Sequence, residues 1–161
     1  MFKWVRLTQN QYLGFFALGL AFFALQELPY ILMPFIPFES NPLMEMQDKV
    51  MLLNAAEKVL GISCIIVMLF IVRGDAKWFS IRTSREKVFF WGAMIAIAGY
   101  FIGWALYFSG VYSLPLILCS LVALPPTYYT FIGLWRGNHA QSVIGPVFLV
   151  VHLLNVWNNL K

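Results

Sequence analysis

Long apolar runs separated by short polar connections dominate the chain. Each run is about twenty residues long, the length that an α-helix needs to cross the hydrocarbon core of a bilayer. We predict transmembrane helices at about residues 11–34, 48–72, 88–108, 114–135 and 141–160. The last run is short for a full crossing. The alternative to five spans is therefore a four-span protein that ends in a re-entrant or surface helix. The predicted fold is an all-α polytopic membrane helix bundle, with residues 1–161 in a single integral membrane domain.

Prolines interrupt two of the predicted spans. Pro29 should kink the first helix beside Glu27, because proline removes a backbone donor and crowds the carbonyl four residues earlier. Pro125 and Pro126 stand in the middle of the fourth span. We therefore expect that span not to be one regular helix.

Composition and charge place the chain in the membrane class. Apolar residues make up 61% of it and charged residues only 11%, where a soluble domain has roughly a quarter charged. Eight of the eleven basic residues fall in the N-terminal segment, in the 73–87 connection and at Arg136. The positive-inside rule then predicts a cytoplasmic N-terminus and 73–87 loop, with the acidic 35–47 loop, which carries Glu39 and Glu45, outside. Membrane lipid is the expected partner of the basic loop, and nothing indicates nucleic-acid binding.

Polar residues inside the predicted spans are the main functional signal. Asn54, Glu57 and Lys58 occupy the first half of the second span and share a helical side with Gly61. An ionisable side chain at membrane depth commonly costs a few kcal/mol and seldom faces lipid. Lys58 could neutralise Glu57 or Glu27, or extend outward along its long stem. We expect the other spans to hide this polar stripe.

Counting about 1.5 Å per residue places polar side chains of several spans in one layer. Glu27, Glu57, Tyr100 and Asn155 fall roughly 10–12 Å below the outer surface, with His152 about one turn deeper. The predicted ligand-binding residues of this layer are Glu27, Asn54, Glu57, Tyr100, Trp104, His152 and Asn155. The alternative is an interhelical hydrogen-bond network that only stabilises the fold.

Three functions fit such a layer. The first is binding or transport of a lipophilic or cationic small ligand in the outer half of the bilayer. The second is an intramembrane acid/base enzyme, similar to an isomerase, with Glu27, Glu57 and His152 as candidate catalytic residues. The third is a non-catalytic subunit of a membrane complex. The G-x-x-x-G pair Gly99 and Gly103 could then contact a partner subunit or a second copy, or serve packing within the chain.

Several established chemistries lack their motifs. The sequence contains no H-E-x-x-H, no glycine-rich phosphate loop and no G-x-S-x-G. Cys64 and Cys119 lie in different predicted helices, so we expect buried free thiols rather than a disulfide or a metal site. We predict neither a metal nor a cofactor.

Three segments resemble EXPERA-type membrane proteins, the group of the sterol isomerase and the sigma-2 receptor. They are FALQELPYILMPF with Glu27, LLNAAEKVLGI with Glu57, and AGYFIGWALYF in the third span. The resemblance covers roughly residues 13–135 and implies that the two acids bind amine-bearing, sterol-like ligands or move a proton. It would also liken Asn155 and Trp157 to a late Asn and Trp of the isomerase, although both lie beyond the matched region. The spacing from Glu57 to the basic loop differs from the family pattern.

Overall fold

The structure is a computed structural model that describes residues 2–38, 41–75 and 77–160. Five helical segments in these residues are long and apolar enough to cross a membrane, which confirms the predicted all-α membrane helix bundle. The segments are formed by α1 (Ala17–Leu32) with the 3₁₀ turn η1 (Met33–Phe35), α2 (Met51–Phe70), α3 (Ser84–Phe108), α4 (Leu114–Leu116) with η2 (Ile117–Val122) and α5 (Leu124–Arg136), and α6 (His139–Leu160). Glu39 of the predicted outer loop lies outside the described residues.

A small antiparallel sheet replaces the predicted start of the first span. Its strands are β1 (Phe2–Arg6), β2 (Gln11–Phe15) and β3 (Ile71–Arg73), in the order β1-β2-β3. The expectation of helix from residue 11 is therefore wrong, and α1 begins at Ala17. The physical reason is a tertiary contact. Gln11 pairs with Arg73 of β3, directly after α2, so the β2 backbone forms its hydrogen bonds in the sheet rather than in a helix.

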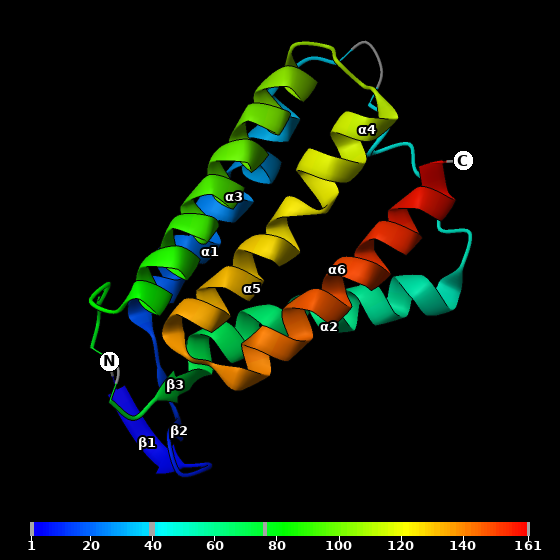
Figure 1. The fold of residues 1–161 in the computed structure, drawn as a ribbon. Coiled ribbons are helices and arrows are strands. Elements are labelled where there is room, and N and C mark those ends of the chain that lie inside the picture. Colours follow the sequence, from blue (N-terminus) through cyan, green and yellow to red (C-terminus); the bar gives the residue numbers. More distant parts are fainter. Residues whose placement is uncertain (1, 39–40, 76, 161) are drawn as a thin grey trace.

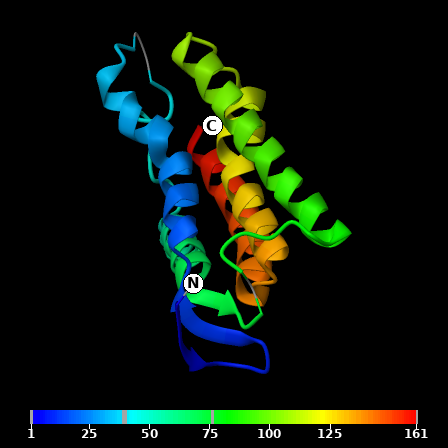
Figure 2. The same ribbon diagram turned by 90° about the vertical axis from the view of Figure 1, so that its left-hand side faces the viewer.

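The helices form a chain of neighbours in which α3 packs on α5, α5 on α6, and α6 on α2. Figure 1 shows the sheet at one end of the bundle, together with the α5–α6 turn, while the C-terminus lies toward the opposite end. In Figure 2, α1 and α3 lie on either side of α5. The first helix contacts α2 and α3 less extensively than α3 contacts α5, α5 contacts α6, or α6 contacts α2.

The fourth span is interrupted, but before the proline pair. Residues of η2 adopt a wider π-helical winding, and α5 starts at Leu124 with Pro125 and Pro126 in its first turn. Proline is tolerated there because the first N–H groups of a helix have no partner within the helix. The widened segment η2 lies against α3.

Small residues let α3 approach the interrupted span closely. A Cβ added at Gly103 would stand 2.5 Å from the Ser120 Cβ, and one at Gly99 would stand 3.0 Å from Leu124. Both glycines are thus used in packing within the chain, one of the two roles that the sequence allowed for them.

We expect Gly103→Val to lower the free energy of unfolding by about 1–3 kcal/mol, because the added methyl groups overfill this contact. Ala105→Val is the matched control, since Ala105 is an exposed residue of the same helix. Thermal unfolding of both variants in detergent, followed by circular dichroism, measures the difference. Equal stability of the two variants would contradict the close α3–η2 contact.

Candidate functional site

A carboxylate, an imidazole and an amide meet between α2 and α6. The Glu57 Oε1 lies 2.8 Å from His152 Nδ1, and Asn155 Nδ2 donates a hydrogen bond to the other carboxylate oxygen. The Glu57 and His152 side chains are 22% and 14% exposed, so the pair is largely hidden from the surface. His152 and Asn155 are three residues apart on α6 and therefore reach α2 from one helical side.

Side-chain amides continue this contact toward the start of α2. Asn159 Nδ2 lies 3.4 Å from both Asn54 Oδ1 and Asn155 Oδ1, and Asn159 Oδ1 accepts a hydrogen bond from Lys49 N at 3.1 Å. Asn54, Asn155 and Asn159 are all buried. Asn159 on α6 contacts Asn54 on α2, and Asn155 on α6 contacts Glu57 on α2, so both amides join α6 to α2.

A partly open pocket of about 150 Å³ lies next to this network. Its walls come from α1, α2, α5 and α6, and every lining residue belongs to a membrane-spanning segment. The lining residues are Gln26, Glu27, Tyr30, Gly61, Ile65, Pro125, Tyr129, Phe148 and His152. Of the predicted site residues, Glu27 and His152 line the pocket, and Glu57 lies behind His152.

The two acids have different surroundings. The Glu57 carboxylate is engaged by His152 and Asn155, whereas no hydrogen bond or ion pair reaches the Glu27 carboxylate from the described part of the chain. Both carboxylates are within electrostatic range of the Tyr30 hydroxyl, so they belong to one neighbourhood. Lys58 is exposed and lines a separate surface pocket with Asp48 and Asn54.

Tyr100 and Trp104 support the pocket from behind. Gln26 Nε2 donates to Tyr100 OH at 3.3 Å, and Tyr129 OH donates to Gln26 Oε1 at 2.7 Å. Trp104 packs edge-on against Tyr30, with 5.0 Å between ring centroids. These contacts hold α1 against α3 and α5, but Tyr100 and Trp104 are not among the lining residues.

Sequence reasoning missed much of the pocket wall. Gln26 is the clearest omission, because a buried amide next to Glu27 at membrane depth is itself a polar signal. Phe148 is stacked on His152 at 5.1 Å between centroids and lies close to Gly61 of α2. Tyr30 and Tyr129 carried no pattern that marked them as lining residues, because their positions depend on how the helices are rotated.

Metal binding finds no support in the described residues, where no group of three His, Cys, Asp or Glu side chains could hold an ion. Cys64 is buried and Cys119 is exposed, both as free thiols. The expectation of burial is therefore wrong for Cys119, which lies in η2.

Comparisons with protein families, with curated proteins and with solved structures found no match. The five apolar helices fit an integral multi-pass membrane protein. Any finer function is therefore inferred from the chemistry of the pocket and its neighbours.

The two acids should differ in their effect on stability. We expect Glu57→Gln to cost about 1.5–3 kcal/mol, the usual range for hydrogen bonds to charged groups, because the carboxylate that bonds to His152 and Asn155 is lost. Glu27→Gln removes no contact of a described residue and removes a charge that is costly at membrane depth, so it should leave the free energy of unfolding unchanged or raise it. Equilibrium unfolding in detergent measures both. A large loss for Glu27→Gln would show that its carboxylate is a structural group.

Proposed function

We propose that this protein binds a lipophilic, cationic small molecule in the pocket between α1, α2, α5 and α6. The observation that carries the proposal is the Glu27 carboxylate, which lines a pocket at membrane depth and has no counter-ion among the described residues. A carboxylate at this depth is costly unless a positive group or polar partner accompanies it. A ligand cation would supply that partner.

The aromatic walls suit a cation with an apolar body. Tyr30, Tyr129 and Phe148 line the same pocket as Glu27. Aromatic faces attract ammonium groups, and the interaction strengthens when water is excluded. Such walls would also accept the methyl or methylene groups that surround the nitrogen of a substituted amine.

The size of the pocket indicates that it would hold only one end of a longer ligand. Its volume of about 150 Å³ is below the roughly 300–1,000 Å³ typical of sites that enclose a drug-sized ligand. Because the pocket is partly open and all its lining residues lie within the spans, an apolar tail could remain in the lipid. Transport of the same ligand is the extension of this proposal, and accumulation in proteoliposomes would measure it.

Binding of N,N-dimethyldodecylamine to the purified protein, followed by native mass spectrometry, tests the proposal. We expect Glu27→Gln to weaken binding about tenfold or more, since that corresponds to roughly 1.4 kcal/mol for the lost ion pair. Asp48→Asn is the matched control, because it removes one exposed acid outside the pocket. Dodecanol, which has the same chain and no charge, should bind weakly to all three proteins. Equal amine binding by the wild type and the Glu27→Gln variant would overturn the proposal.

A second candidate function rests on His152. This side chain lines the pocket while Glu57 holds its Nδ1, an arrangement in which a carboxylate orients an imidazole for proton transfer. The corresponding activity is acid/base chemistry on a lipid-like substrate, in which one carbon loses a proton and the same or another carbon gains one from solvent.

Incubation of the purified protein with a lipid extract in deuterated water tests this activity. A substrate isomerised by proton removal and return would gain carbon-bound deuterium, which mass spectrometry detects. We expect His152→Gln to abolish the incorporation, with Asn158→Asp, a change outside the pocket on the same helix, as the control. No incorporation above that of protein-free lipid would exclude the enzymatic function for those lipids.

The resemblance to EXPERA-type membrane proteins remains part of this proposal. The resemblance would give both acids a role in binding a ligand or in transferring a proton. The different surroundings of Glu27 and Glu57 support Glu27 as the residue that contacts the ligand. Asn155 contacts Glu57, whereas Trp157 lines a separate surface groove with Leu118. We also propose that the end with the 73–87 connection is cytoplasmic, which would put the pocket near the middle of the bilayer, with Glu27 and His152 on its outer side.

A further inference from the structure

We propose that the end of the bundle that carries the sheet binds a phosphate group in a basic pocket. The pocket lies between the 73–86 connection and the end of α5, and has a volume of about 240 Å³. Its lining residues are Arg73, Asp75, Lys77, Ser80, Arg82, Thr83, Glu86, Trp135 and Arg136. None of them belongs to the Glu27 pocket, so this site is independent of the proposed function.

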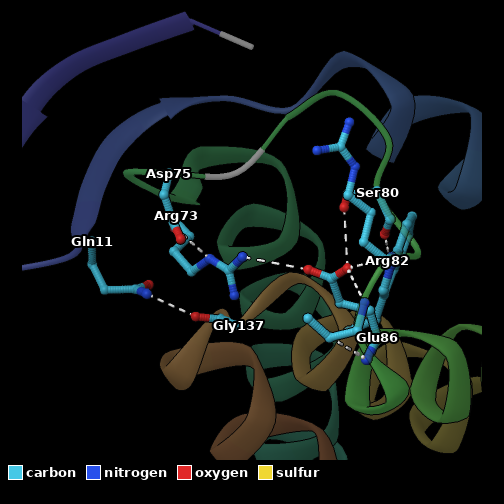
Figure 3. A network of polar contacts seen from close by, with 9 residues as sticks. Gln11, Arg73, Asp75, Ser80, Arg82, Glu86 and Gly137 are labelled. Atoms are coloured by element: carbon cyan, nitrogen blue, oxygen red, sulfur yellow. Dashed lines mark hydrogen bonds and ion pairs between the residues drawn. The ribbon is translucent and has the colours of Figure 1, made fainter.

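Arg73 is held between two carboxylates. Its Nε lies 2.6 Å from Asp75 Oδ1, and its Nη2 lies 3.6 Å from Glu86 Oε1, as Figure 3 shows. Its side chain also lies against the backbone of Gly137, where an added Cβ would meet the guanidinium at 2.9 Å. Arg73 is therefore placed at the pocket by contacts from three segments.

Glu86 is largely occupied by the protein itself. Its Oε2 accepts hydrogen bonds from Ser80 Oγ at 3.1 Å, Arg82 N at 2.8 Å and Thr83 N at 3.3 Å. The Thr83 hydroxyl accepts in turn from Glu86 N, which completes a capping box at the start of α3. This buried carboxylate shapes the connection, and its other oxygen, Oε1, faces Arg73.

The pocket carries an excess of positive charge. Four cationic side chains line it, at Arg73, Lys77, Arg82 and Arg136, against the two carboxylates, which leaves an excess of two positive charges. Asp75 is exposed and already paired with Arg73. Like charges gathered around one hollow repel one another, and an anion between them would relieve that repulsion.

Arg136 is positioned by aromatic rings. Its guanidinium carbon lies 4.5 Å from the centroid of Phe16 and 5.3 Å from that of Trp135. Trp135 is fixed in turn, because its Nε1 donates to the Ser80 carbonyl at 2.7 Å. Because it lies against these ring faces, the guanidinium keeps a defined orientation and brings its positive charge to the pocket.

Size and surroundings favour the phosphate of an anionic lipid. A cavity of only about 10–15 Å³ can hold one water molecule. The basic pocket, at about 240 Å³, therefore has room for a polyatomic anion such as phosphate. Phe2, Trp78 and Phe79 are exposed nearby, and aromatic residues are enriched at the depth of lipid headgroups. Basic pockets at the cytoplasmic ends of membrane helices commonly bind such headgroups.

The test uses the full-length protein in detergent, titrated with dioleoylphosphatidylglycerol and followed by native mass spectrometry. The pocket variant is Lys77→Gln/Arg82→Gln, whose side chains are exposed and whose loss leaves the backbone bonds of Glu86 intact. The matched control is Arg85→Gln/Lys87→Gln, which removes the same charge from neighbouring positions outside the pocket. Phosphatidylcholine is the zwitterionic comparison, and inorganic phosphate in large excess is the competitor.

We expect the pocket variant to bind phosphatidylglycerol about tenfold more weakly, and the control to stay within about twofold of the wild type. If inorganic phosphate displaces the lipid, the same pocket also accepts the free anion; if it does not, the lipid headgroup is the source. Equal weakening by the two variants would overturn the proposal, because it would mean diffuse attraction to a basic loop. Unchanged binding by the pocket variant would overturn it as well.

Discussion

The exclusion of water from the hydrocarbon core is the constraint on which the rest of this structure depends. A carboxylate on a spanning helix must find its partners on another helix. Glu57 finds them on α6, in His152 and Asn155, and the amides of Asn54 and Asn159 extend the contact. These bonds hold α2 and α6 together, and α6 packs in turn on α5 and α5 on α3.

The first helix is attached by different means, and the pocket lies where it joins the others. The β2 strand that precedes it pairs with the end of α2, and Gln26 bonds to Tyr100 and Tyr129 on α3 and α5. Glu27 follows Gln26 directly in the sequence and lines the pocket beside this attachment. A carboxylate with no partner among the described residues reduces stability at this depth, and this cost is the physical basis of the ligand that we propose.

The basic pocket and the Glu27 pocket are built on opposite uses of charge. At the sheet end, Glu86 is buried and accepts three hydrogen bonds, so it orders the connection, and it also pairs with Arg73. At the Glu27 pocket a single acid faces the space without such support. In our two proposals, the first arrangement holds an anion between positioned cations, and the second holds a cation between a single acid and aromatic walls.

The sequence by itself determined the five spans and the interruption of the fourth, because helix length and apolarity are local properties that a bilayer selects directly. It also placed Glu57, His152 and Asn155 at nearby depths, since depth follows from counting along a helix. Tertiary structure decided the rest. Gln11 to Phe15 became a strand because partners from distant segments were present, and Tyr30, Gln26 and Phe148 became pocket walls through the rotation of their helices. Glu57 has partners because α6 packs against α2, whereas Glu27 faces the pocket. This difference depends on which helices pack together, and no single stretch of the chain determines it.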